Sequence, residues 1–71
     1  MAEENIRVTI NGQVETVPPG YTIAQLVAWL GHTGPHVLVE HNRQYIFPEQ
    51  WSRRTIHAGD RLELIHPLFG G

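Results

Sequence analysis

The residues most able to take part in chemistry stand at the end of the sequence, where Gly70 is followed by Gly71. Glycine has no side chain and adopts backbone angles that other residues avoid, so two in succession can thread a narrow channel. A terminal carboxyl group has an ordinary pKa of about 3.5, so it is ionised at pH 7 and is a poor electrophile. It needs activation before a nucleophile attacks it, and ATP-dependent adenylation is the standard route. The alternative interpretation is an ordinary frayed terminus that happens to be glycine.

The five histidines are the second group of residues that could do chemistry. His32 and His36 stand four residues apart, and His41 is nearby in the sequence. Zinc requires three or four converging ligands, and the sequence has no cysteine and no HExxH-like helix. We therefore expect no metal site, and histidines at the surface. The sequence shows no phosphate-binding loop, carboxylate pair or Ser/His/Asp combination, so we expect no catalytic activity and no bound cofactor.

Length and composition limit the classes of protein that remain. The chain has 71 residues, of which 41% are hydrophobic, which suits one small domain spanning residues 1–71 and excludes a disordered chain. The net charge of −2 disfavours a nucleic-acid partner, and no segment is apolar enough to span a membrane. The absence of cysteine excludes a disulfide scaffold and makes the cytoplasm the expected location. We expect a monomer when the protein is free.

The first part of the sequence predicts a hairpin of two strands. After a frayed start at residues 1–4, residues 6–10 alternate hydrophobic and polar side chains, as in a half-buried strand. Asn11-Gly12 tolerates the positive φ angles of a two-residue turn. A second strand is predicted at residues 13–17, and its register stays open because the alternation is imperfect. Pro18-Pro19-Gly20 ends this strand.

A helix is predicted directly after this hairpin. With Thr22 as N-cap, Gln25 occupies the third helical position, so the two side chains form a capping box. The residues that follow the spacing of one buried helix face are Ile23, Leu26, Val27 and Leu30. Gly31 offers a C-terminal cap, and Gly34-Pro35 prevents any continuation. The result is an amphipathic helix of two to three turns, with Trp29 outside the buried stripe and partly exposed.

The rest of the chain predicts short extended segments separated by turns. Strands are expected at residues 37–42, at 45–47 and at 61–66. Between the last two, a helical turn at residues 49–51 places Trp51 against the sheet, and residues 57–60 have the composition of a turn.

This order of elements predicts the fold class. One amphipathic helix cannot bury its apolar stripe alone, and a sheet needs a cover on its apolar face. We therefore expect an α+β domain in which a mixed sheet of four to five strands packs on one main helix. A last strand parallel to the first would place both in the centre of the sheet, which is the β-grasp arrangement. Residues 67–71 would then extend past the last strand as a flexible C-terminal tail.

Several motifs occur together along nearly the whole chain: Asn11-Gly12, Thr22 with its helix, Asn42, Pro48 with Trp51, Gly59-Asp60 followed by Leu62-Glu63-Leu64-Ile65, and Gly70-Gly71. In this combination the chain resembles the ubiquitin-like sulfur carrier proteins, most closely the carrier of thiamine (thiazole) biosynthesis. The diglycine that follows a β-grasp pattern is the specific part of the resemblance. The sequence departs from the family at Phe69, where members commonly carry a smaller residue.

The resemblance implies a role for the tail. In this family an adenylating enzyme related to ubiquitin-activating enzymes uses ATP and Mg²⁺ to form an acyl-adenylate at the last glycine. A sulfur donor fed by a cysteine desulfurase converts it to a thiocarboxylate, and thiazole synthase accepts the sulfur. Gly71 would therefore carry the adenylate and then the sulfur, while Leu68, Phe69 and Gly70 would enter the partner's channel. The protein would be a carrier and not an enzyme.

Other functions fit the same residues. The sulfur acceptor could instead be molybdopterin synthase, a transfer RNA, or a cysteine or siderophore pathway, although Pro48 and Trp51 match the thiamine carriers better. A ubiquitin-like modifier would join its diglycine to a target lysine, and the absence of lysine in this chain is compatible with either role. A non-covalent adaptor would not need the tail at all.

Three further groups of residues are candidates for contact with a partner. Leu68 and Phe69 lie beyond the last predicted strand and would gain burial only against another protein. Trp29, outside the helix stripe, would mark a contact surface if it is exposed. Arg53-Arg54 could pair with an acidic surface, but a solvated turn is the favoured interpretation because exposed ion pairs contribute little.

Overall fold

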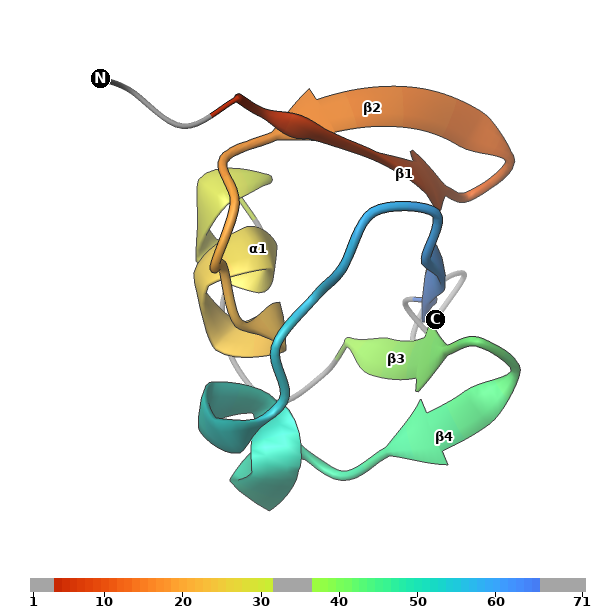
Figure 1. Cartoon of the computed structure of the whole chain (residues 1–71). Helices are drawn as coiled ribbons and strands as arrows, with labels where there is room; N and C mark the ends of the chain where they lie inside the picture. Colours follow the sequence, from red (N-terminus) through yellow and green to blue (C-terminus); the bar gives the residue numbers. More distant parts are fainter. Residues whose placement is uncertain (1–3, 32–36, 66–71) are drawn as a thin grey trace.

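Figure 1 shows the computed structural model of the chain, which describes residues 4–31 and 37–65. Its elements are, in chain order, strands β1 (Ile6–Ile10) and β2 (Gln13–Val17), helix α1 (Ile23–Trp29), strands β3 (Leu38–His41) and β4 (Gln44–Ile46), the 3₁₀-helix η1 (Pro48–Arg53) and strand β5 (Arg61–Ile65). The strands form one sheet in the order β2-β1-β5-β3-β4. Strand β5 is parallel to β1, and the other neighbours are antiparallel. The predicted mixed sheet with one main helix is confirmed.

The first hairpin turns at Asn11 and Gly12, as the sequence predicts. Their φ angles are 51° and 83°, the left-handed values of a two-residue turn whose twist matches that of the flanking strands. The register that the sequence left open pairs Ile6 with Val17, so Val17 faces the core and is completely buried. Val14 faces the other side of the sheet and is 67% exposed.

Helix α1 begins at the predicted capping box. The Thr22 side chain accepts a hydrogen bond from the backbone N–H of Gln25 at 3.2 Å, and the Gln25 side chain accepts one from the backbone N–H of Thr22 at 2.9 Å. The helix ends at Trp29 after about two turns. Gly31 then adopts a φ of 85° and donates its N–H to the carbonyl of Ala28.

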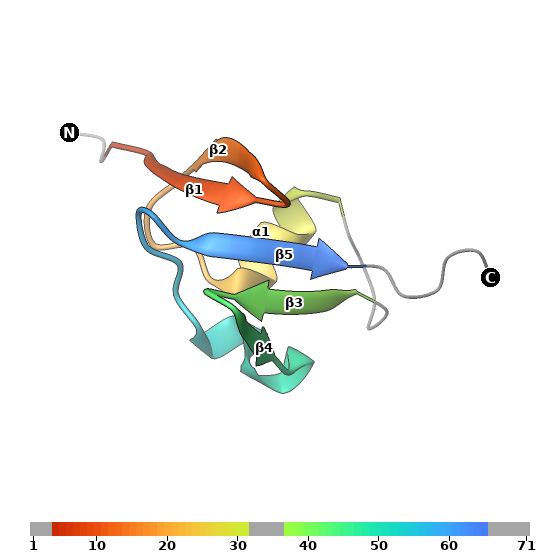
Figure 2. The ribbon, with the colours of Figure 1, turned by 90° about the vertical axis from the view of Figure 1, so that its right-hand side faces the viewer.

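The core lies between α1 and one face of the sheet, and no helix or strand of the described part covers the other, open face (Figure 2). The buried hydrophobic residues come from every strand, from the helix and from the connecting segments: Val8, Ile10, Val17, Ile23, Leu26, Val27, Val37, Val39, Ile46, Ile56, Leu62 and Leu64. Ile6, Tyr21, Leu30 and Trp51 pack against them at the edge. The predicted apolar stripe of the helix therefore faces the sheet, and burial of this surface is the main stabilising term of so small a domain.

The centre of the sheet joins the two ends of the described chain. Strands β1 and β5 pair in parallel, with Thr9 beside Arg61 and Ile10 beside Leu62. Asn11 continues this ladder past the end of β1: its N–H donates to the carbonyl of Leu62 at 2.9 Å, and its Oδ1 accepts from the N–H of Leu64 at 2.8 Å. The residue that forms the first turn thus also holds the last strand in place.

The segment between β3 and β5 differs in detail from its prediction. The turn between β3 and β4 is formed by Asn42 and Arg43 with positive φ angles of 53° and 72°, an arrangement that an arginine adopts at a cost. The helical turn is longer than predicted, since η1 runs from Pro48 to Arg53. Trp51 is partly buried against the core, as expected, and its Nε1 donates to the carbonyl of Ile46 at 3.2 Å.

Some sequence-based expectations concern residues outside the described part. These are the frayed residues at the start (apart from the exposed Glu4), the Gly34-Pro35 stop and the tail at residues 67–71. Within residues 4–31 and 37–65, no helix has the length and apolar character needed to cross a membrane.

Candidate functional site

The residues of the predicted reactive tail come after β5 in the sequence, beginning three residues past its end. Leu68, Phe69, Gly70 and Gly71 all lie outside the described residues, so their predicted roles stay predictions. The structure shows the strand from which this segment continues (Figure 2). Strand β5 ends at Ile65, which is 43% exposed on the open face of the sheet.

Strand β5 is held on both sides. Its inner residues Leu62 and Leu64 are buried against the core, and it pairs with β1 on one edge and with β3 on the other. The β3 register places Leu38 opposite Ile65, so the pairing continues to the last residue of the strand. The starting point of the tail is therefore fixed by the centre of the sheet and not by a surface loop.

A polar cluster fixes the other end of β5. The Nε2 of His41 lies 2.7 Å from Oδ2 of Asp60, to which the ring N–H donates because an ionised carboxylate only accepts. The same oxygen accepts from the backbone N–H of His57 at 2.8 Å. Asn42 donates its Nδ2 to Asp60 at 3.2 Å, and its own Oδ1 accepts from the N–H of Arg61 at 2.8 Å. The cluster thus ties the β3–β4 turn to the first residue of β5.

The pKa of Asp60 reflects two opposing effects. Burial raises the pKa of this carboxyl, because it removes water from the charged form. The hydrogen bonds from His41, from the His57 backbone and from Asn42, together with the attraction of His41, outweigh burial and hold the pKa below its ordinary value of 3.8. The carboxyl group is therefore kept ionised as an acceptor.

The expectation of surface histidines is wrong for His41. Its side chain is only 9% exposed, because it continues the inward-facing row of Val37, directly before β3, and Val39 on β3. Its Nδ1 is buried and has no hydrogen-bond partner among the described residues. The alternation of residues 37, 39 and 41 in the sequence is itself a signal of burial for His41. His57 is exposed, and His32, His36 and His66 lie outside the described residues.

No cluster of potential metal ligands occurs within residues 4–31 and 37–65. The Nε2 of His41 is hydrogen-bonded to the carboxylate of Asp60. The His32 and His36 pair considered in the sequence lies outside this range.

The surface candidates have different environments. Trp29 is 48% exposed at the end of α1, as expected for a residue outside the buried stripe. Arg53 is exposed, which agrees with a solvated turn. Arg54 does not agree with a solvated turn, because it is partly buried. Its Nη2 donates to Oε1 of Gln44 at 3.0 Å, and its carbonyl accepts from the N–H of Ile23. Arg54 therefore has a structural role between η1, β4 and α1.

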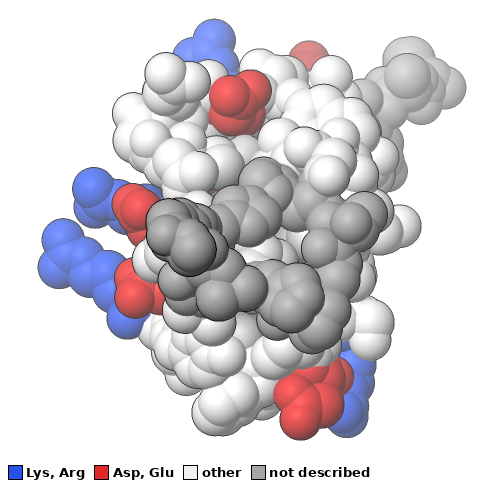
Figure 3. Space-filling model, turned by 180° about the vertical axis from the view of Figure 1, so that it is seen from behind, with Lys and Arg blue, Asp and Glu red and all other residues white. Residues whose placement is uncertain are grey.

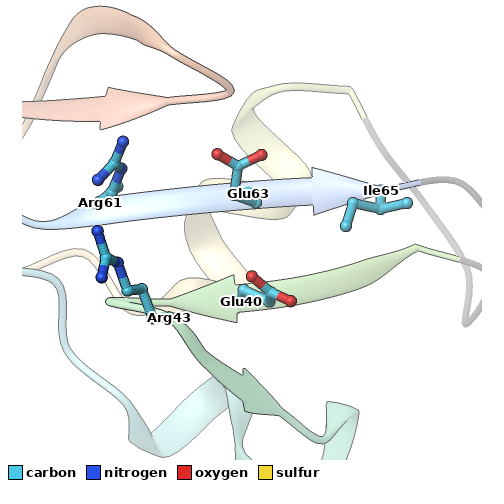
Figure 4. Close-up of a pocket in the computed structure, with 5 residues that line it drawn as sticks. All are labelled: Glu40, Arg43, Arg61, Glu63 and Ile65. Carbon is cyan, nitrogen blue, oxygen red and sulfur yellow. The ribbon is translucent and has the colours of Figure 1, made fainter.

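The open face of the sheet carries a shallow charged groove that the sequence analysis did not find. It has a volume of about 260 Å³ and is lined by Glu40, Arg43, Arg61, Glu63 and Ile65 (Figure 4). Glu40 and Glu63 lie directly opposite one another on β3 and β5. We call these five residues the charged groove. They come from two segments that are distant in sequence, residues 40–43 and 61–65, and the pairing of β3 with β5 brings these together.

The fold and the parallel β1–β5 pair define the protein as a ubiquitin-like β-grasp domain. Comparison with protein-family models matches residues 5–71 to the ThiS family, which covers all but the first four residues. The chain belongs to the ThiS family of small sulfur carrier domains, which is not a family of catalytic enzymes.

A solved structure supports this assignment. The crystal structure of a thiamine biosynthesis protein (ThiS) from Geobacter metallireducens superposes on the chain with a TM-score of 0.81. The two sequences are 26% identical, and the match covers 93% of this chain and 100% of that protein. No curated protein sequence shows significant similarity to the chain.

Proposed function

We propose that this protein carries sulfur for thiamine biosynthesis on the carboxyl group of Gly71. An adenylating enzyme transfers AMP from ATP to that carboxylate and releases pyrophosphate. A persulfide sulfur donor then attacks the acyl-adenylate and displaces AMP, which forms an acyl disulfide. A thiol cleaves the S–S bond of this acyl disulfide, so that the thiocarboxylate is released and the donor leaves as a mixed disulfide with the thiol. Thiazole synthase takes the sulfur from the thiocarboxylate. We place these steps in the cytoplasm, where both enzymes would meet the carrier.

The observation that carries this proposal is the extent of the family match. The match runs to residue 71 and so includes Gly70-Gly71 as well as the domain. The named structural relative is a thiamine biosynthesis protein, which favours the thiazole branch over the other sulfur acceptors. An adaptor that does not use its tail would need only the domain.

The fold suits a carrier because it fixes the strand that precedes the proposed reactive end of the chain. Strand β5 is paired on both edges and is fixed at its start by Asp60 and Asn42. Six residues separate Ile65 from the end of the sequence at Gly71, and six extended residues span at most about 20 Å. A partner can therefore bind the open face near Ile65 while the carboxyl group of Gly71 reaches its catalytic centre.

Adenylation is tested by a change at the reactive end. The protein that ends at Gly71 and a variant extended by one alanine are each incubated with the adenylating enzyme from the same genome. We expect ATP–pyrophosphate exchange with the first protein only. In the extended variant the carboxyl group of Gly71 is part of a peptide bond and cannot be adenylated. Circular dichroism and thermal unfolding should be identical for the two proteins. Equal exchange rates would contradict an acyl-adenylate at Gly71.

A further inference from the structure

The surface of η1 holds a second shallow pocket, separate from the charged groove. It has a volume of about 240 Å³ and is lined by Gln50, Arg53 and Arg54. The segment η1 packs beside α1, on the side of the sheet that the helix covers (Figure 1). Seen from behind, η1 lies at the lower right, and Figure 3 shows basic side chains there as well as at the left. We call the three lining residues the η1 pocket.

The start of η1 determines which end of the Gln50 amide is available to the pocket. The Oε1 of Gln50 accepts a hydrogen bond from the backbone N–H of Phe47 at 3.3 Å. The end that remains for the pocket is the Nε2 group, which only donates. Gln50 and Arg53 stand three residues apart on a 3₁₀-helix, where side chains at this spacing lie above one another. Both therefore project to the same side of η1.

Arg54 is the fixed member of the pocket. Its backbone N–H donates to the carbonyl of Trp51 at 3.5 Å, and its carbonyl accepts from the N–H of Ile23 at 2.9 Å. Its Nη2 donates to Oε1 of Gln44 at 3.0 Å, and the side chain is partly buried. The guanidinium group is thus held in position before any ligand binds, and it keeps N–H donors that Gln44 does not use.

The η1 pocket combines positive charge with hydrogen-bond donors. Arginine has no acceptor, and the acceptor of Gln50 is already bound to Phe47. The acidic residue of η1, Glu49, does not line the pocket, and within residues 4–31 and 37–65 it forms no ion pair with either arginine. A pocket of this kind favours an oxyanion. A phosphate group, with more acceptor oxygens than a carboxylate, fits three donating side chains best.

We propose that the η1 pocket binds a phosphate group, either free phosphate or the phosphate of a nucleotide. Arg53 and Arg54 donate to its oxygens and balance its charge, and the Nε2 of Gln50 donates to a further oxygen. This site does not depend on the proposed function, because none of its residues belongs to β5 or to the residues that follow it.

The test is an NMR titration of the ¹⁵N-labelled protein with inorganic phosphate and, separately, with AMP. The titrations are done at constant ionic strength and about pH 7.5, where phosphate groups are mostly dianionic. Three variants each lower the net charge by one: Arg53→Gln and Gln50→Glu in the pocket, and Arg7→Gln at an exposed site on β1 as the control. Gln50→Glu keeps the oxygen that accepts from Phe47 but replaces the Nε2 donor with a negative charge.

We expect saturable shifts centred on residues 50–54 in the wild type, with the same Kd in Arg7→Gln to within about twofold. Binding should be at least about fivefold weaker in Arg53→Gln, which loses a charged hydrogen bond. Gln50→Glu should show no saturable binding, because two negative charges would meet at short distance. Thermal unfolding checks that each variant is folded, and if a pocket variant is not, the position of the wild-type shifts decides.

The two ligands distinguish the sources of the phosphate group. Tighter binding of AMP than of phosphate at residues 50–54 would support the proposal with a nucleotide as the ligand. Equal or weaker binding of AMP would support it with free phosphate. Absence of saturable shifts in the wild type, shifts spread over all exposed arginines, or equal affinities in the pocket variants and Arg7→Gln would overturn the proposal.

Discussion

The Nε2 of His41 lies 2.7 Å from Oδ2 of Asp60, and this contact joins the end of β3 to the residue before β5. Asp60 stands at the point where three segments meet, because it also binds the backbone of His57 and the side chain of Asn42. Strand β5 leads to the residues that carry the proposed chemistry. The carboxylate of Asp60 therefore sets the position of a strand whose other end presents the tail.

Removal of this carboxylate should destabilise the domain. Asp60→Ala leaves the N–H groups of His41, His57 and Asn42 without their acceptor, and His41 is buried. We expect the free energy of unfolding to fall by about 2–3 kcal/mol, as for a charged acceptor with several donors. Urea unfolding followed by circular dichroism measures the change. Glu49→Ala, at an exposed site, is the control and should change the free energy by less than about 0.5 kcal/mol. If Asp60→Ala lowers the free energy of unfolding by less than about 0.5 kcal/mol, the polar cluster does not hold β5 in place.

The same carboxyl group should make stability depend on pH in the acid range. Its pKa is below 3.8 in the folded protein, so the folded state binds a proton more weakly than the unfolded chain does. The contribution of Asp60 is therefore complete above its unfolded pKa and is lost as the pH falls through the lowered value. We expect the stability difference between the wild type and Asp60→Asn to shrink from about pH 5 to about pH 2. A constant difference across that range would contradict the lowered pKa.

Asn11 should be hard to replace because it has two functions. Its φ of 51° favours Asn, Asp or Gly, and its Oδ1 accepts from the N–H of Leu64 on β5. We expect Asn11→Asp to retain the most stability, Asn11→Gly to lose about 1–2 kcal/mol with the hydrogen bond, and Asn11→Ala to lose about 1 kcal/mol more through backbone strain. Chemical denaturation of the three variants gives the order. If alanine and glycine are equivalent, backbone strain at this turn has no measurable effect.

Phe69 should affect binding more than folding. Under the proposed function, this aromatic residue directly before the glycine pair would contact the channel that receives the tail, and buried aromatic contacts dominate many interfaces. We expect Phe69→Ala to change the KM of the carrier for the adenylating enzyme severalfold, with the free energy of unfolding altered by less than about 0.5 kcal/mol. Val14→Ala, at an exposed hydrophobic residue on β2, is the control. A large fall in melting temperature for Phe69→Ala would show that the tail packs on the domain.

The sequence predicted the elements whose signals are local. Asn11-Gly12 and the Thr22–Gln25 capping box depend on residues at most three apart, so their chemistry can be recognised without the fold. The parallel pairing of β1 with β5 is not local. It could still be predicted, because one helix and one sheet have few other ways to cover the apolar stripe of the helix and the apolar face of the sheet.

The features that the sequence missed are set by strand register. His41 meets Asp60 across 19 residues, and Glu40 meets Glu63 across β3 and β5, so neither pair has a signal at short spacing. Arg43 in the left-handed region shows tertiary structure overriding the preference of a residue, because the hairpin of β3 and β4 needs a tight turn at that position. Contacts between strands that are distant in sequence therefore required the fold.

The central claim is that Gly71 carries sulfur, and the absence of cysteine makes it directly measurable. A thiol-selective alkylating reagent labels only a sulfur that has been added to the chain. The protein is incubated with Mg-ATP, the adenylating enzyme from the same genome and a sulfur source, then alkylated and mapped by mass spectrometry, with a reaction lacking ATP as the control. We predict one ATP-dependent adduct on Gly71. Gly71 found unlabelled, or joined to lysines of other proteins, in the presence of an active enzyme would contradict the sulfur carrier function.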